Sequence, residues 1–132
     1  MKNMHQLLTS ARQAMANAYA PYSGFKVGAA ILADDGKIYT GANVENVSYP
    51  CGTCAEAGAI AAMVCGGGKK IAVILVVSGG KVLVTPCGAC LQRINEFGGA
   101  ETPVLLANDE AGVVKEMTLA DLLPQAFKEF DR

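Results

Sequence analysis

The sequence contains a single histidine, His5, and this scarcity excludes a metal site built on several histidines. It has no apolar run long enough to cross a bilayer, because residues 71–77, the longest run, fall far short of the roughly 20 residues that a spanning helix needs. The first residues lack the apolar stretch and small-residue cleavage site of a secretory signal. These absences predict a cytoplasmic protein without a membrane partner.

Clusters of positive charge are absent as well. The 11 Lys and Arg residues are scattered along the chain and are balanced by 12 Asp and Glu residues. A protein that binds the phosphates of nucleic acid needs a basic patch, so we expect no nucleic-acid polymer among the partners. Hydrophobic residues make up 52% of the sequence, which excludes a disordered chain. The length fits one domain, residues 1–132, around one core.

Helical and extended patterns alternate along the chain. Helices are predicted at residues 3–18, 54–65, 88–97 and 118–123, where Thr118 caps the last one. Strands are predicted at residues 26–33, 37–43, 70–77, 104–107 and 113–116. The third of these strands is almost continuously apolar, as in a central strand that is covered on both faces. We therefore predict an α/β fold, a three-layer α-β-α sandwich around one mixed five-stranded sheet.

The five cysteines are too few for a disulfide-rich scaffold, and in a reducing compartment they are expected to bind metal, to react or to pack. Cys65 is isolated in an Ala-rich stretch, and we expect it to pack as a small hydrophobic side chain. The other four form two CxxC pairs, Cys51-Gly-Thr-Cys54 and Cys87-Gly-Ala-Cys90. These two pairs are the candidate metal ligands.

The pairs allow two interpretations. In the first, all four thiolates close a structural zinc site that stabilises a non-enzymatic binding module. Two observations weigh against it: a predicted helix and strand separate the pairs, and an apolar α/β domain of this size does not need a metal to fold. In the second, Cys54-Ala55-Glu56 followed by Pro86-Cys87-Gly88-Ala89-Cys90 forms the pattern of zinc-dependent deaminases.

The second interpretation suits a catalytic metal. Cys54, Cys87 and Cys90 would hold one Zn²⁺ per chain and leave the fourth position open for water. Cys87 and Cys90 are neighbours on the first turn of a helix, where backbone N–H groups and the helix dipole favour thiolates. Glu56 would move protons without binding the metal. The side chains of residues i and i+2 point in different directions on a helix, so we expect Cys54 in a non-helical first position, from which it can face the same metal as Glu56. We expect Cys51 to lie outside the ligand set.

Around these motifs the sequence resembles the cytidine deaminases, specifically the short-chain branch with three cysteine ligands. The resemblance also rests on residues 20–30 (A-P-Y-S-x-F-x-V-G-A-A), 41–46 (G-x-N-V-E-N) and 122–127 (L-L-P-x-A-F). It implies zinc-dependent hydrolytic deamination of cytidine or deoxycytidine to the uridine product and ammonia. Zinc-bound hydroxide would attack C4, while Glu56 carries protons to the ring nitrogen and the leaving amine.

The resemblance further implies contacts with the substrate. Asn43 and Glu45 would hold the ribose hydroxyls. Phe25 would pack against the base, and the backbone of Ala55 would face the pyrimidine edge.

The same resemblance implies a homotetramer in which subunits complete each other's sites. Tyr49 and Phe127 would approach the pocket from neighbouring subunits. The apolar composition agrees with self-association, because a small domain this apolar has more hydrophobic surface than it buries alone.

Two positions depart from the resembled family, which commonly carries arginine directly after the glutamate and after the last zinc cysteine. This chain has Ala57 and Leu91 there. Three thiolates outweigh the charge of Zn²⁺ and weaken it as a Lewis acid, so we expect the helix N-termini or Arg93 to offset them. Ala57 and Gly58 also replace larger residues beside the site. A modified cytosine nucleoside or a blasticidin-type antibiotic is therefore an alternative substrate.

Overall fold

The computed structural model describes residues 3–80 and 83–130. Its helices are α1 (Met4–Ala16), α2 (Ala55–Cys65), α3 (Gly88–Phe97) and α4 (Leu119–Leu122), and a 3₁₀ turn, η1, covers Tyr49–Cys51. Its strands are β1 (Val27–Ala33), β2 (Ile38–Ala42), β3 (Ile71–Ser78), β4 (Pro103–Asn108) and β5 (Gly112–Thr118). Apart from η1, which has no counterpart in the sequence analysis, each element lies where the sequence predicts one.

One mixed five-stranded sheet forms the middle of the molecule. The strand order is β2-β1-β3-β4-β5, and the β3–β4 pair is parallel while the other pairs are antiparallel. β3 lies at the centre, and every residue in it except Ala72 is buried. The prediction that residues 70–77 form a central strand is confirmed.

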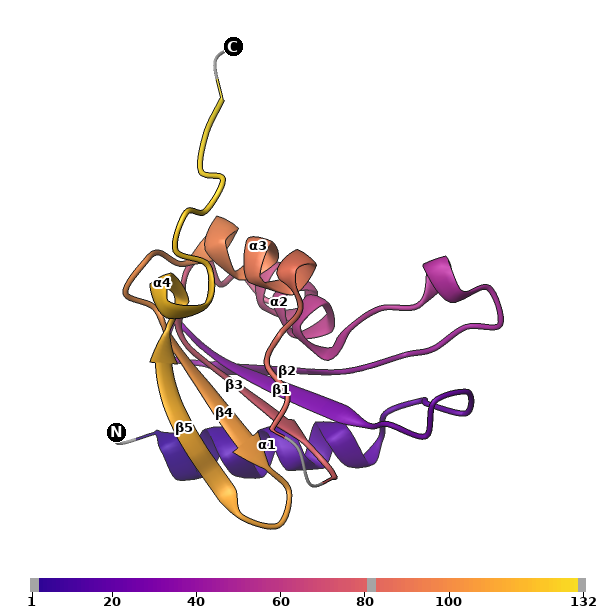
Figure 1. Ribbon diagram of the computed structural model, residues 1–132. Coiled ribbons are helices and arrows are strands. Elements are labelled where there is room, and N and C mark those ends of the chain that lie inside the picture. The colour runs from indigo at the N-terminus through magenta and orange to yellow at the C-terminus, as the bar shows by residue number, and fades with distance from the viewer. Residues whose placement is uncertain (1–2, 81–82, 131–132) are drawn as a thin grey trace.

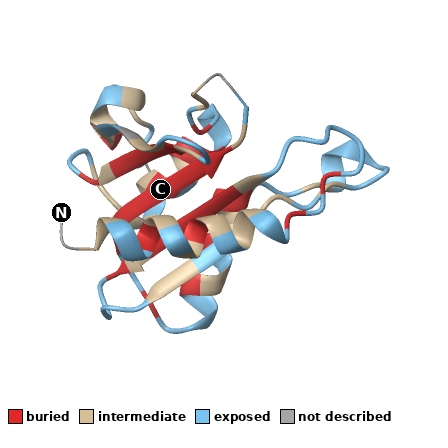
Figure 2. Cartoon of the chain, turned by 90° about the horizontal axis from the view of Figure 1, so that it is seen from below, coloured by how far each residue is buried: buried red, intermediate tan, exposed pale blue. Residues whose placement is uncertain are grey.

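Helices cover both faces of the sheet, with α1 on one side and α2, α3 and α4 on the other (Figure 1). Successive side chains of a strand point to opposite faces, so β3 contributes to two cores. Leu75 packs in the core that contains Leu7 of α1, and Ile74 packs in the core that contains Ile94 of α3. The sheet is accordingly the most buried part of the chain (Figure 2). The predicted three-layer sandwich is confirmed.

The hairpin between β1 and β2 turns at Gly36, whose φ of 81° is the left-handed conformation that favours glycine. Asp34 Oδ1 accepts hydrogen bonds from the backbone N–H groups of Lys69 (2.9 Å) and Lys70 (3.2 Å). This carboxylate therefore joins the hairpin to the chain that enters β3.

Cys65 is exposed at the last position of α2, so the prediction that it packs in the core is wrong. α2 buries Ala55, Ala59 and Met63, which recur every four residues along one side of the helix. Cys65 comes two positions after Met63 and therefore points away from that side. The stretch is apolar on all sides, which hid the orientation from the sequence.

The segment between β2 and α2 extends from one end of the sheet as a long arm (Figure 1). Isolated bridges join Val44 to Tyr19 on one side and to Thr53 on the other. The arm leads into Cys54 and Ala55 at the start of α2. None of the helices in residues 3–80 and 83–130 has the length and hydrophobicity of a bilayer-spanning segment.

Candidate active site

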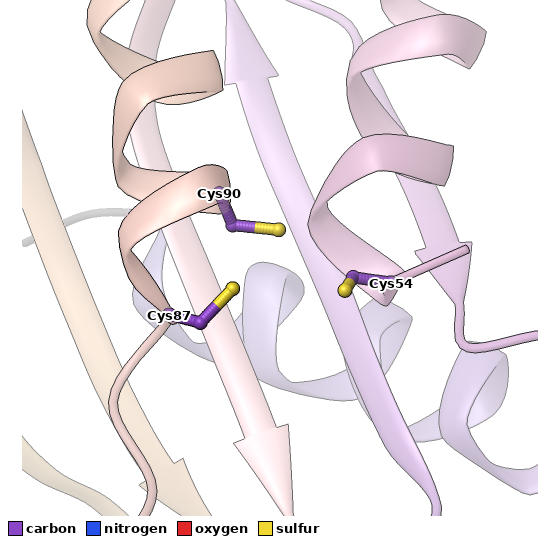
Figure 3. Close-up of side chains that lie close together, drawn as sticks. All are labelled: Cys54, Cys87 and Cys90. Carbon is purple, nitrogen blue, oxygen red and sulfur yellow. The ribbon is translucent and has the colours of Figure 1, made fainter. Parts of the chain in front are cut away.

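Three sulfur atoms converge between the first turns of α2 and α3 (Figure 3). Cys54 precedes α2, while Cys87 and Cys90 lie at the start of α3. Their Sγ atoms all lie within 4.8 Å of one another. Among the residues that the structure describes, this is the one group of His, Cys, Asp or Glu that could hold a metal ion.

The backbone at Cys54 explains how a cysteine and a glutamate two positions apart serve one site. Cys54 is the N-cap of α2 with φ −82° and ψ 158°, an extended conformation. Glu56 already lies in the first helical turn. The change from extended to helical backbone turns both side chains toward the same region, as the sequence predicts.

Cys87 takes the same position on α3, as an N-cap with φ −71° and ψ 168°. The backbone N–H groups of Cys90 and Ala89 hold the pKa of the Cys87 thiol below its usual value. Burial instead raises the pKa of Cys90 to about 12, and the charges of Glu56 and Cys54 add to this rise. Without a cation, Cys90 is thus the thiol that most resists ionisation.

The sulfur group fits a zinc ion. Tetrahedral zinc with Zn–S bonds of about 2.3 Å places its sulfur ligands roughly 3.8 Å apart, within the limit of 4.8 Å that these three sulfurs obey. Thiolates are ligands that zinc prefers, and three of them leave a fourth position free. Cys54 and Cys87 are exposed and Cys90 is buried, so solvent reaches one side of the group.

Glu56 lies beside the sulfur group without belonging to it. Its charge acts on all three cysteines, and its side chain is only 5% exposed. Burial raises the pKa of its carboxyl group, while the positive charge of Arg93 acts in the opposite direction. A buried carboxyl group with a raised pKa can take up and release a proton at a metal-bound ligand.

A cavity of about 530 Å³ adjoins the start of α2. This volume is in the usual range for a site that holds a small molecule. Its lining combines both ends of the arm with the loop before β1, namely Tyr22, Ser23, Val27, Asn43, Val44, Glu45, Asn46, Tyr49, Gly52, Thr53, Cys54 and Ala55. The cavity therefore includes one member of the sulfur group and the residue next to Glu56.

Asn43 and Glu45 both line the cavity, and both also brace the loop before β1. Asn43 Oδ1 accepts a hydrogen bond from Val27 N (2.9 Å), and its Nδ2 donates one to Phe25 O (2.8 Å). Glu45 Oε1 accepts from the backbone N–H groups of Tyr22 (2.9 Å) and Ser23 (3.1 Å). One amide hydrogen of Asn43 and further lone pairs of Glu45 stay available to a ligand.

Sequence reasoning missed Tyr22 and Ser23 as part of this arrangement. The Ser23 hydroxyl donates a hydrogen bond to Glu45 Oε2, and together with the backbone N–H groups it lowers the pKa of Glu45. The Tyr22 ring contacts the Tyr49 ring edge-on, with centroids 6.1 Å apart. Both residues belong to the segment that carried the family resemblance, and that was the available signal.

Two of the three aromatic residues named by the sequence, Phe25 and Phe127, are not among the residues that line the cavity of this chain. Phe25 is partly exposed and is held through its backbone, and Phe127 lies on the C-terminal segment, where its ring stacks on Phe130. The Phe127 carbonyl accepts hydrogen bonds from Gln92 Nε2 (2.8 Å) and Asn95 Nδ2 (3.3 Å) of α3. Tyr49 lines the cavity of its own chain.

The four-cysteine site is not formed. Cys51 lies in η1 on the arm, is exposed, and is outside the sulfur group. Its Sγ donates to Ser48 Oγ at 3.5 Å.

Arg93 supplies positive charge at the sulfur group. Its Nη1 donates a hydrogen bond to Cys90 Sγ at 3.4 Å. Leu91 is 6% exposed and packs in the core, and Ala57 is half-buried, so neither offers a charge. The observed contact agrees with the expectation that Arg93 offsets the negative charge of the thiolates.

Comparisons with known proteins agree with this geometry. Residues 1–106 match the sequence model of the family described as the cytidine and deoxycytidylate deaminase zinc-binding region. A cytidine deaminase of Sporosarcina psychrophila is 43% identical over 98% of this chain and 94% of the relative. A cytidine deaminase of Mycobacterium tuberculosis is 45% identical over 93% of this chain and 88% of the relative.

The fold agrees as well. The crystal structure of a cytidine deaminase from Burkholderia pseudomallei superposes with a TM-score of 0.86 and 42% identity, over 93% of this chain and 98% of that one. Family match, sequence identity, fold and sulfur group all point the same way, and this chain belongs to the cytidine deaminase family.

Proposed function

We propose that this chain catalyses the hydrolytic deamination of cytidine and deoxycytidine to the uridine product and ammonia. The observation that carries the proposal is a buried glutamate, Glu56, beside three convergent sulfurs at the edge of a cavity of about 530 Å³. Identities of 43% and 45% to cytidine deaminases over nearly the whole chain support the choice of substrate class.

Cys54, Cys87 and Cys90 would hold one zinc ion per chain. Bound in this way, zinc supplies a water molecule with a pKa lowered toward about 7. Thiolate ligands suit a reducing compartment, and we place the protein in the cytoplasm.

Glu56 would move the protons of the reaction. Its pKa is raised by burial, so the carboxylate can accept a proton from water and give it to the ring nitrogen N3. The carboxylate would then take the second proton of the added water, from the hydroxyl group on C4, and give it to the amine as the C4–N bond breaks and ammonia leaves. One carboxyl group thus acts as base and then as acid, and it needs no ligand bond to do so.

The substrate would lie in the cavity with its base toward Cys54 and Ala55. The backbone of Ala55 would face the pyrimidine edge, and the exposed ring of Phe25, which does not line the cavity of this chain, would turn to pack against the base. Asn43 and Glu45 would receive the ribose hydroxyls, as donor and acceptor. Their hydrogen bonds to the loop before β1 hold both side chains in place before a ligand arrives.

We further propose a homotetramer in which subunits complete each other's sites. Although Tyr22 and Phe130 contact their rings, Tyr49 stays 77% exposed and Phe127 62% exposed, which is costly for aromatic side chains. Both would approach the cavity of a neighbouring subunit, and Tyr49 would also line its own.

An ammonia-release assay on a panel of nucleosides tests the proposed function. The panel contains cytidine, deoxycytidine, cytosine, ring-substituted cytidines and a blasticidin-type antibiotic. We expect turnover of cytidine and deoxycytidine and little release from free cytosine, which lacks the ribose that Asn43 and Glu45 would hold. Activity confined to the modified nucleosides or the antibiotic would refute cytidine as substrate.

A further inference from the structure

The side chain of Arg93 is oriented toward the sulfur group, although its residue lies on the exposed surface of α3. Its side chain is exposed on α3, three residues after Cys90, where it could extend into solvent. Instead its guanidinium group turns to the Cys90 sulfur, and Nη1 donates a hydrogen bond to Sγ at 3.4 Å. An arginine loses side-chain conformational entropy when it makes such a contact. A favourable interaction at the sulfur must therefore offset this loss.

The charges around the sulfur group provide the reason. The Cys87 sulfur accepts hydrogen bonds from backbone N–H groups at the start of α3, and Cys54 is the N-cap of α2. Cys90 is buried one turn into α3 and faces the negative charges of Glu56 and Cys54. Of the three sulfur-bearing residues it is the only buried one, and Arg93 is the cation that contacts it.

The neighbouring positions do not provide that cation. Ala57 follows Glu56 and Leu91 follows Cys90, and neither side chain carries charge. Leu91 is buried in the core between the sheet and its covering helices, where an ionised side chain would be costly. The positive charge of Arg93 acts on Cys90, Cys54 and Glu56 from the solvent side of α3.

We propose that Arg93 is a positioning residue of the metal site, which fixes the Cys90 sulfur by a charge-assisted hydrogen bond and offsets the excess negative charge of three thiolate ligands. The proposal rests on the proposed function, because it takes these cysteines as the zinc ligands. Partners of this kind orient a ligand and tune the metal without touching it. Arg93 would therefore influence zinc affinity first and turnover through the metal.

The test compares the full-length wild type with Arg93→Gln, Arg93→Lys and Arg12→Gln. Arg12→Gln is the matched control, because it removes the same charge from α1 on the opposite face of the sheet. Zinc affinity is measured by competition with a chromophoric chelator. The sulfur-to-cobalt charge-transfer band of the cobalt-substituted proteins is recorded as a second readout.

We expect Arg93→Gln to weaken zinc binding by about 10- to 100-fold and to shift the cobalt band. Arg93→Lys should restore part of the affinity, since it keeps the charge, and Arg12→Gln should match the wild type. Equal zinc affinity and an unchanged cobalt band in wild type and Arg93→Gln would overturn the role of Arg93, whatever the activity. A wild type that binds zinc tightly yet releases no ammonia from any nucleoside would instead overturn the proposed function.

Discussion

At the residue scale, the site depends on two cysteines that precede helices rather than lie within them. Cys54 and Cys87 both have extended backbone and both cap a helix. At Cys87 this places the sulfur near backbone N–H groups, which favour thiolate, whereas at Cys54 burial raises the pKa of the thiol. The extended backbone also lets Glu56 face the same region as Cys54. Two equivalent helix starts, brought together by one sheet, therefore assemble the sulfur group.

The exclusion of Cys51 gives a residue-scale prediction. Cys51→Ser should leave the zinc content and the ammonia-release rate close to those of the wild type, because Cys51 lies in η1 outside the sulfur group. Cys90→Ser, the matched comparison, should lose most of the zinc. Metal analysis per chain after gel filtration gives the answer. Loss of zinc in Cys51→Ser would restore the four-thiolate interpretation.

Asp34 gives a prediction on pH dependence. Hydrogen bonds from the backbone N–H groups of Lys69 and Lys70 hold the pKa of this carboxyl group below its ordinary value of 3.8. A carboxyl group whose pKa is lower in the folded state stabilises the fold above its unfolded pKa, and this contribution is lost as the pH falls through the folded pKa. The free energy of unfolding should therefore be higher for wild type than for Asp34→Asn at neutral pH.

The difference between wild type and Asp34→Asn should shrink as the pH falls below about 4. Urea denaturation of the two proteins at a series of pH values measures it. A difference that stays constant down to about pH 2 would contradict the role of the ionised carboxylate.

At the element scale, the position of α2 depends on how closely it approaches β2. A Cβ atom at Gly41 would lie 2.3 Å from both Ala55 O and Ala59 N, which are backbone atoms of α2. On the α2 side of the contact, a Cβ atom at Gly58 would lie 3.5 Å from the Cα atom of Gly41. Because α2 carries Glu56 and begins at Cys54, this close contact helps to set the geometry of the site.

Gly41→Ala should therefore affect stability and the site together. The added methyl group has no space and must displace α2, at a cost of about 1–3 kcal/mol or more in the free energy of unfolding. Zinc affinity and turnover should fall with it. Gly99→Ala is the control, because a Cβ at Gly99 meets nothing within 4 Å, and its stability should change by less than about 0.5 kcal/mol. Denaturant unfolding and zinc titration of both variants measure these effects. If Gly41→Ala had the same free energy of unfolding and the same zinc affinity as Gly99→Ala, the proposed role of the close contact would be wrong.

At the scale of the whole molecule, patterns within one element could be predicted from the sequence, and contacts between distant segments could not. The continuous apolar run before Ser78 predicts a buried central strand because both faces of that strand need apolar side chains. The need for Cys54 and Glu56 to share a site predicts a non-helical Cys54.

The contacts that escaped prediction join residues far apart in the chain. Glu45 accepts hydrogen bonds from Ser23 and Tyr22, which lie more than 20 residues earlier in the sequence, and no local sequence pattern predicts these contacts. The exposure of Cys65 could not be predicted, because an Ala-rich helix lacks the polar face that would show which side is buried. The position of Arg93 on the first turns of α3 could be anticipated, whereas the direction of its guanidinium group depends on the packed helix.

Removal of the metal is a test at this scale. The two cores on either side of the sheet consist of apolar side chains and do not involve the sulfurs of Cys54 and Cys87. A chelated protein should therefore keep its far-UV circular dichroism and unfold cooperatively. Its melting temperature should be lower, because zinc at about 1,000 times its Kd contributes roughly 4 kcal/mol to the folded state. Loss of the folded signal on chelation would contradict a catalytic site and favour a structural one.

The most direct measurement of the central claim is ammonia release from cytidine by wild type and Glu56→Gln, with zinc quantified per chain in both. The amide keeps the size of the side chain but cannot carry a proton between water and the pyrimidine. We expect one zinc per chain in each protein and a turnover at least about 100-fold lower in the variant. A zinc-loaded Glu56→Gln that retains the wild-type rate, or a zinc-loaded wild type that leaves cytidine unchanged, would contradict the account.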